Sequence, residues 1–170
     1  MSWAGSKAKN ASLDAFALCF DASAAWRNGL IRRYFLMPIS HERQPGSVLG
    51  SEKLTAFVST HDPASAKAFY RDRLGLRLLS EDSFALVFDA NGTKLRVSIV
   101  AEVAVARYTV LGWDVPDIVT TATNLRKAGV KLEIFGGFPQ DELGVWAAPD
   151  GAKVAWFKDP DGNILSIAQH

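Results

Sequence analysis

Two similar stretches of chain, beginning near residues 53 and 107, constrain the fold more than any other feature of the sequence. Each has an apolar run, an Asp suited to capping a helix, an amphipathic helical segment and a Gly suited to ending it. The cap candidates Asp62 and Asp117 are 55 residues apart, and the closing glycines Gly75 and Gly129 are 54 apart. This regular spacing predicts a duplicated structural unit.

The first unit is expected to contain one helix and four strands. Apolar alternation and turn residues place the helix at 63–74 and the strands at 53–59, 76–80, 84–89 and 94–100. Asn91-Gly92, between the last two strands, is the strongest short hairpin signal and predicts that Val87 lies beside Arg96. The first unit therefore has the predicted order βαβββ.

The second unit repeats this order but is longer. A strand is expected at 107–114, a helix at 117–128 and a hairpin at 154–169. If Asp159-Pro160-Asp161-Gly162 forms a four-residue loop, Ala155 and Phe157 lie on the same face as Ser166. About fifteen additional residues fall within 135–151. They form either an ordinary long connection, an extra edge strand or a loop that contributes to a pocket.

Composition bounds the class of protein. The 170-residue chain is 48% hydrophobic and has 19 basic and 18 acidic side chains, for a net charge of +1. This balance gives no reason to expect binding to nucleic acid or to an anionic membrane, so the expected partner is a small molecule. The single cysteine, Cys19, cannot form an internal disulfide, and no apolar run approaches the roughly 20 residues of a spanning helix. We expect a cytoplasmic protein.

Residues 1–50 differ from the rest and are interpreted as an N-terminal extension to a domain at 51–170. Apolar residues in 13–36 have a partly helical spacing, and Asp14 and Asp21 interrupt the apolar centre that a secretory signal needs. The extension could be an amphipathic helix that docks on the domain or on a partner. It could equally be a translated upstream segment, partly disordered and followed by a polar linker.

Two motifs resemble a known family. Residues 58–75, VSTHDPASAKAFYRDRLG, resemble the opening strand and helix of the vicinal oxygen chelate superfamily, and residues 156–166, WFKDPDGNILS, resemble its closing hairpin. The superfamily contains glyoxalase I, extradiol dioxygenases, fosfomycin resistance enzymes and bleomycin resistance proteins. The likeness covers residues 53–169 and is strongest for a bacterial glyoxalase-like subgroup with no settled reaction.

The resemblance implies an α+β fold in which two βαβββ modules, 53–100 and 107–169, form a curved, cup-shaped mixed sheet. Helices would pack on the convex side and a ligand would bind in the concave cup. Members are often dimers, so a homodimer is expected. We refer to the two stretches below as the first and second modules.

The family's usual metal positions carry poor ligands in this chain. Carried over by the resemblance, they fall on Thr55, Arg96 (with Ser98 next on that face), Val110 and Ser166. None is a His, Glu or Asp, and an arginine would bring a fixed positive charge to a cation site. The three histidines, His41, His61 and His170, are scattered. We therefore predict no metal site and no cofactor.

Strand alternation predicts the lining of the cup. The expected ligand-binding residues are Thr55, Phe57, Arg96, Ser98, Val110, Phe157 and Ser166 on strands, with Phe138, Gln140 and Trp146 on the long loop. Arg96 could bind a carboxylate or phosphate through two hydrogen bonds, or could pair with Asp89, Asp114 or Asp141 instead. Trp113 and Trp156 are expected in the core.

Evidence for catalysis is weaker. Asp141, Glu142 and His61 are the candidates for an acid/base pair, but loop carboxylates are commonly just exposed. Three functions stay open. The first is a metal-independent protein that binds a small amphipathic or anionic molecule, as bleomycin resistance proteins do. The second is a glyoxalase-like lyase or isomerase with a relocated metal or an acid/base pair. The third is a partner-binding role in which 13–36 docks.

Overall fold

The structure is a computed structural model that describes residues 48–170. Within it, residues Glu52–His170 form one compact unit. The predicted N-terminal extension, apart from its last three residues, lies outside the described residues, and so does the expected helix at 13–36. Among residues 48–170, no helix combines the length and the apolar character that crossing a bilayer requires.

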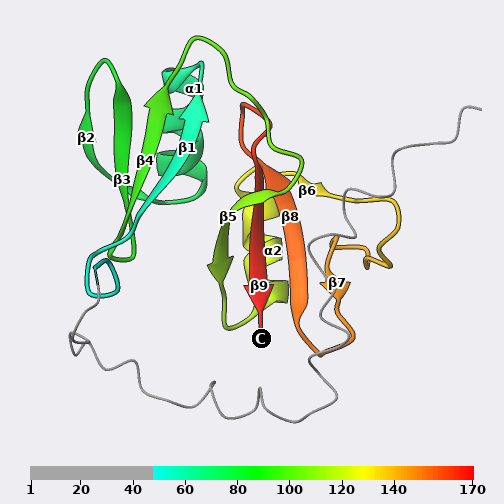
Figure 1. Ribbon diagram of the computed structural model, residues 1–170. Helices are drawn as coiled ribbons and strands as arrows, with labels where there is room; N and C mark the ends of the chain where they lie inside the picture. Colours follow the sequence, from blue (N-terminus) through cyan, green and yellow to red (C-terminus); the bar gives the residue numbers. More distant parts are fainter. Residues whose placement is uncertain (1–47) are drawn as a thin grey trace, which may run out of the picture. The chain divides into compact units, whose positions relative to one another are not determined.

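The first module contains a single four-stranded sheet (Figure 1). Its elements are β1 (Thr55–Thr60), α1 (Pro63–Lys67), η4 (Ala68–Arg73), β2 (Arg77–Glu81), β3 (Ala85–Ala90) and β4 (Thr93–Ile99). The strand order is β1-β4-β3-β2, with β1 parallel to β4 and the other pairs antiparallel.

The predicted first helix forms over the expected residues but changes its winding midway. Asp62 caps its start by accepting hydrogen bonds from the amides of Ala64 and Ser65, both at 3.1 Å. The final turns widen into the π-helical segment η4, where the Leu74 amide donates to the Phe69 carbonyl at 3.0 Å. Gly75 follows with a φ of +74°, as expected of a residue that ends a helix.

The second module repeats the arrangement with one extra strand. Its elements are β5 (Thr109–Asp114), α2 (Ile118–Lys127), β6 (Leu132–Glu133), β7 (Trp146–Ala147), β8 (Lys153–Lys158) and β9 (Ile164–Gln169). The sheet order is β5-β9-β8-β6, and again the first strand is parallel to the last. β7 pairs with β8 beside β6, so part of the long connection is the extra edge strand considered above.

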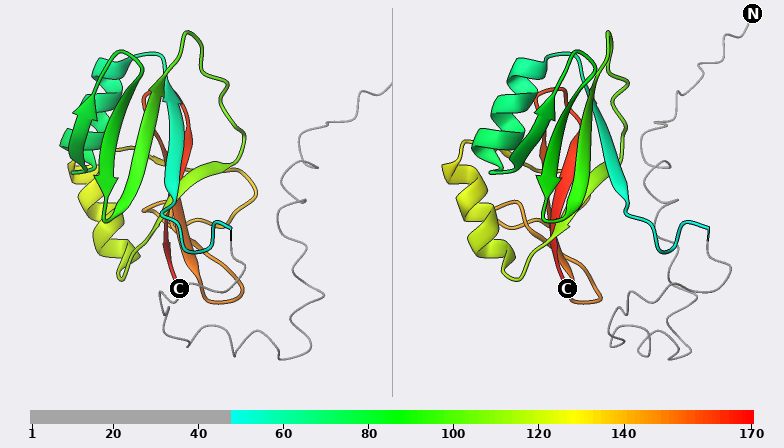
Figure 2. Two further views of the ribbon diagram at one scale, coloured as in Figure 1. Left: turned by 60° about the vertical axis from the view of Figure 1, so that its left-hand side comes forward. Right: turned by 90° about the vertical axis from the view of Figure 1, so that its left-hand side faces the viewer.

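Among residues 48–170, the helices lie on one face of the sheets only (Figure 2), and we call the opposite face the open face. One cluster of buried side chains runs through both modules on the helix side, including Phe69, Tyr70, Phe88, Phe157 and Leu165. The sheets curve but do not close into a barrel. These observations confirm the predicted α+β fold with two βαβββ modules.

The closing hairpin has a different register from the predicted one. Its loop contains five residues, because Lys158 pairs with Ile164 and Trp156 pairs with Ser166. The fifth loop residue is Asn163, whose amide donates to Asp159 Oδ1 at 2.9 Å. The slip of one residue turns β8 over. Trp156 therefore shares the open face with Ser166, and the predicted placement of Ala155 and Phe157 on that face is wrong.

The same hairpin loop ties the two modules together. Tyr70 Oη donates to Asp159 Oδ2 at 2.8 Å, and Asn163 Nδ2 donates to the Ser59 carbonyl at 3.0 Å. His61 contacts Asp161 through its imidazole and also donates its backbone amide to Asp161 Oδ1 at 2.9 Å. Residues about 100 positions apart are thus joined across the module boundary.

Candidate functional site

Arg96 lies on the open face of the first module, as predicted. In the sheet it stands between Phe57 of β1 and Val87 of β3. Arg96 is half-buried, whereas Phe57 is 62% exposed. Thr55 and Ser98 belong to the same face by strand alternation, because Val58, Leu95 and Val97 of the alternate set are buried in the core. The first-module sheet thus combines a guanidinium, hydroxyls and an aromatic ring on one open surface.

The acidic residues considered as partners of Arg96 are engaged elsewhere. Asp89 pairs with Arg77 at 2.8 Å, Asp114 lies 3.5 Å from His170, and Asp141 accepts hydrogen bonds from two loop amides. Arg96 helps to lower the pKa of Asp82, after the larger effect of the Phe84 and Ala85 amides that donate to that carboxylate. Within residues 48–170, no ion pair involves Arg96.

The open face of the second module is built around Ser166. Ser166 stands between Gly112 of β5 and Trp156 of β8. A Cβ at Gly112 would lie 2.8 Å from Ser166 Oγ, so the glycine leaves room for that hydroxyl. The Trp156 indole reaches across β9, and its Nε1–H donates to Thr109 Oγ1 at 3.1 Å. Trp156 was missed as an open-face candidate because the predicted hairpin register was off by one residue, and Thr109 because β5 is irregular between Thr109 and Leu111.

The long loop packs an aromatic cluster against Trp156. The ring centroids of Phe138 and Trp146 are 5.0 Å apart, and those of Trp146 and Trp156 are 6.2 Å apart in a stacked arrangement. Phe135 and Phe138 also lie against Trp156, at 5.8 and 5.6 Å. Trp156 is therefore not part of the central core, contrary to the prediction, whereas Trp113 stacks on the buried Phe157 and packs against that core.

Three predicted ligand-binding residues have structural roles. Phe157 is only 1% exposed and lies in the core. Val110 is displaced from the open face by an irregularity in β5 between Thr109 and Leu111, and it packs against the core instead. The Gln140 amide organises its own loop: it accepts from the Phe135 amide at 2.7 Å and donates to the carbonyls of Glu133 and Gly144.

The proposed acid/base residues have separate surroundings. His61 contacts Asp161 in the hairpin loop. Asp141 Oδ1 accepts from the amides of Leu143 and Val145, both at 2.9 Å, while Glu142 lines a hollow on the Arg126 side of the second module. No hydrogen bond or ion pair in the described part of the chain joins any two of His61, Asp141 and Glu142.

The residues at the family's usual metal positions do not fit a divalent cation. Thr55 and Ser166 offer only hydroxyl groups, Val110 offers no donor and Arg96 carries a positive charge. Among residues 48–170, no three His, Cys, Asp or Glu side chains cluster in a way that could hold a metal ion. The open face therefore presents hydroxyl, guanidinium and aromatic groups for ligand contacts.

Solved structures of other proteins share this fold. Solved structures with the same fold include lactoylglutathione lyase from Agrobacterium tumefaciens, with a TM-score of 0.55 and 16% identity over 70% of this chain and 93% of that one. A superfamily member from Sphaerobacter thermophilus has a TM-score of 0.54 and 18% identity over 69% and 96%. A glyoxalase/bleomycin resistance protein/dioxygenase from Alicyclobacillus acidocaldarius has a TM-score of 0.55 and 16% identity over 76% and 95%.

These identities are low, so the structural likeness concerns the fold. No curated protein matches the sequence. A family model, however, matches residues 54–167, which include both modules. The resemblance noted in the two sequence motifs is thereby confirmed: the chain belongs to the Glyoxalase/Bleomycin resistance protein/Dioxygenase superfamily.

Proposed function

We propose that the open face binds a small amphipathic anion, most simply an aromatic carboxylate, without a divalent metal. The observation that carries this proposal is Arg96: a half-buried guanidinium that has no ion pair among the described residues and stands beside the exposed Phe57. A guanidinium in this setting is suited to bind a carboxylate through two parallel hydrogen bonds.

The second module supports the apolar part of the ligand. Trp156 and the aromatic residues packed on it, Phe138 and Trp146, offer ring surfaces, and Thr109 and Ser166 offer hydroxyl groups. Small-molecule sites commonly combine an apolar lining with a few polar groups that fix the ligand's orientation. A planar ring with one negative charge satisfies both kinds of group.

The proposal is tested by calorimetric titration of the full-length protein with benzoate and 2-naphthoate. Removing the guanidinium in Arg96→Gln is expected to weaken binding about tenfold or more, because a charge-assisted hydrogen bond contributes about 1.5–3 kcal/mol. Arg77→Gln is the matched control, since Arg77 lies at the sheet edge and pairs with Asp89. Chelator treatment should leave the affinity unchanged.

Two results would contradict the proposal. One is the absence of saturable binding of either carboxylate by the wild-type protein at millimolar concentrations. The other is an equal loss of affinity in the Arg96 and Arg77 variants, which would indicate only a general effect of charge. Benzylamine, which has the same ring and a positive charge, should bind more weakly than benzoate. The homodimer and the cytoplasmic location stay predictions, the first measurable by sedimentation of the full-length chain.

A further inference from the structure

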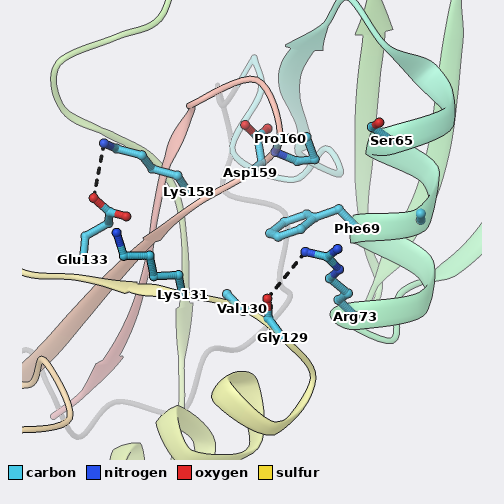
Figure 3. Close-up of a pocket in the computed structure, with 11 residues that line it drawn as sticks. Ser65, Phe69, Arg73, Gly129, Val130, Lys131, Glu133, Lys158, Asp159 and Pro160 are labelled. Atoms are coloured by element: carbon cyan, nitrogen blue, oxygen red, sulfur yellow. Dashed lines mark hydrogen bonds and ion pairs between the residues drawn. The ribbon is translucent and has the colours of Figure 1, made fainter.

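A crevice separate from the open face lies between the two modules (Figure 3). Its volume is about 380 Å³, and none of the open-face residues named above lines it. One wall is the helix of the first module, with Phe69 and Arg73, and the other comes from the second module, with Val130, Lys131 and Lys158. The crevice is therefore large enough for a small organic molecule and is formed only when both modules are in place.

Cations dominate the free charge of this crevice. Glu133, one of its two carboxylates, lies 3.3 Å from the Lys158 ammonium. The other, Asp159, is 6% exposed, and its oxygens already accept hydrogen bonds from Tyr70 and Asn163. By contrast, no ion pair of the described residues involves Lys131.

Arg73 is also available to bind an anion. Its Nη1 makes a single long hydrogen bond of 3.5 Å to the Gly129 carbonyl across the crevice. The neutral carbonyl is a weaker partner for a guanidinium than an anion is. Figure 3 shows Arg73 on the helix wall and the two lysines on the opposite side, with the Phe69 ring between them. An occupant would meet positive charge at both ends and apolar surface in the middle.

We propose that this crevice binds a small organic dicarboxylate between the cations of the two modules. One negative group engages Arg73 in place of the Gly129 carbonyl, and Lys131 neutralises the other charge. The apolar part lies against Ala68 and Pro160, which are exposed, above Phe69 and Val130, which the core holds in place. This site is independent of the aromatic carboxylate proposed for the open face.

Binding here would couple to the stability of the fold. The ligand contacts a helix of the first module and the segment that follows α2 in the second, so it binds the native arrangement and not the unfolded chain. A ligand with this preference raises the melting temperature as its concentration increases. Salt should weaken the effect, because the three cations are exposed.

The experiment titrates the full-length protein with phenyl phosphate and, separately, with succinate, by calorimetry and by thermal denaturation. Arg73→Gln and Lys131→Gln are each expected to weaken binding roughly two- to fivefold, as for the loss of an exposed ion pair. Arg71→Gln is the control on the same helix, since Arg71 pairs with Asp72, and Lys127→Gln is the control beside the second wall. Succinate is expected to bind more tightly than phenyl phosphate, because the two charges of phenyl phosphate lie on a single group and cannot reach both walls.

Three results would overturn the proposal: no saturable binding of succinate, equal weakening in the control variants, or binding of phenyl phosphate as tight as that of succinate. The replaced side chains are all exposed, so each variant should fold, which its unliganded melting temperature verifies. Arg96→Gln should leave dianion binding unchanged. Failure of benzoate to bind would therefore count against the open-face proposal and leave this one intact.

Discussion

Gly112 and Ser166 are neighbours, and each restricts which side chain the other can carry. Because Gly112 has no side chain, there is space beside it for the Ser166 hydroxyl. They stand opposite each other in the parallel pairing of β5 and β9. A Cβ on Gly112 would approach Ser166 Oγ to 2.8 Å, closer than an unstrained carbon–oxygen contact, while the next atom, the Ser166 carbonyl oxygen, is at 3.7 Å. The conflict thus involves the hydroxyl and not the backbone, so it can be relieved by removing that one atom.

A double-mutant cycle on Gly112→Ala and Ser166→Ala tests this pairing. Replacing Gly by Ala in a strand also restricts the unfolded chain, but that contribution is the same in both backgrounds and cancels. We expect Gly112→Ala to be more favourable, by about 1 kcal/mol, when Ser166 is alanine than when it is serine. Urea denaturation of the four proteins measures the coupling. Additive effects of the two substitutions would show that the contact imposes no strain.

The surroundings of Arg96 were predicted from the sequence only in part. Its neighbours Phe57 and Val87 follow from strand alternation and from the Asn91-Gly92 turn, whose φ angles of 53° and 89° are those of a two-residue hairpin. The sequence could not predict that the candidate acidic partners of Arg96 contact other residues. Those contacts depend on how exposed side chains of separate elements meet.

At the scale of elements, the two hairpins show why one register could be predicted and the other could not. The β3–β4 turn contains only its two turn residues, so the predicted pairing of Val87 with Arg96 is confirmed. In the β8–β9 loop, Asp159 accepts the Asn163 amide as well as the Asp161 amide, which extends the loop by one residue. A motif of Asp, Pro, Asp and Gly does not reveal that side-chain bond, and Trp156 and Phe157 exchange faces as a result.

The long loop of the second module is organised by Gln140. Its half-buried side-chain amide makes hydrogen bonds to three backbone groups of the loop. These bonds hold the aromatic residues Phe138 and Trp146 against Trp156. Gln140→Ala is expected to lower the free energy of unfolding by about 1–3 kcal/mol, because three polar backbone groups lose their partner. Gln140→Glu should be at least as harmful, since a carboxylate cannot donate to the two carbonyls.

Denaturant unfolding followed by tryptophan fluorescence measures this effect, since two of the tryptophans lie in the affected cluster. Glu142→Ala, an exposed position two residues along, is the control and should change the unfolding midpoint little. A wild-type midpoint for Gln140→Ala would contradict the structural role and would return Gln140 to the predicted set of ligand contacts.

For the molecule as a whole, the hairpin loop acts as the connection between the modules. Asp159 accepts hydrogen bonds from Tyr70 of the first module and Asn163 of its own loop, and the Tyr70 ring packs edge-on against Phe69 at 5.2 Å. Burial raises the pKa of Asp159 above its usual value, although the hydrogen bonds from Asn163 and Tyr70 act in the opposite direction. The motif that identifies the family thus also joins the two halves of the fold.

Tyr70→Phe tests this connection through its dependence on pH. Because the pKa of Asp159 is raised in the folded state, its contribution to stability is present below the unfolded pKa of about 3.9 and is lost as pH rises through the folded pKa. The Tyr70 hydroxyl limits that loss by donating to the ionised carboxylate. Without it the folded pKa rises further, so we expect Tyr70→Phe to cost about 2 kcal/mol at pH 7 and less near pH 4.

Unfolding free energies from denaturant titrations across this pH range, each compared with wild type at the same pH, measure the effect and cancel the other titrating groups. Tyr108→Phe is the control, because Tyr108 is 63% exposed. The Tyr70 ring keeps its packing in the variant, so a cost that does not change with pH would mean that the hydroxyl stabilises the fold without supporting the charge of Asp159. A cost that grows from acid to neutral pH would identify the buried carboxylate as the group through which Tyr70 joins the modules.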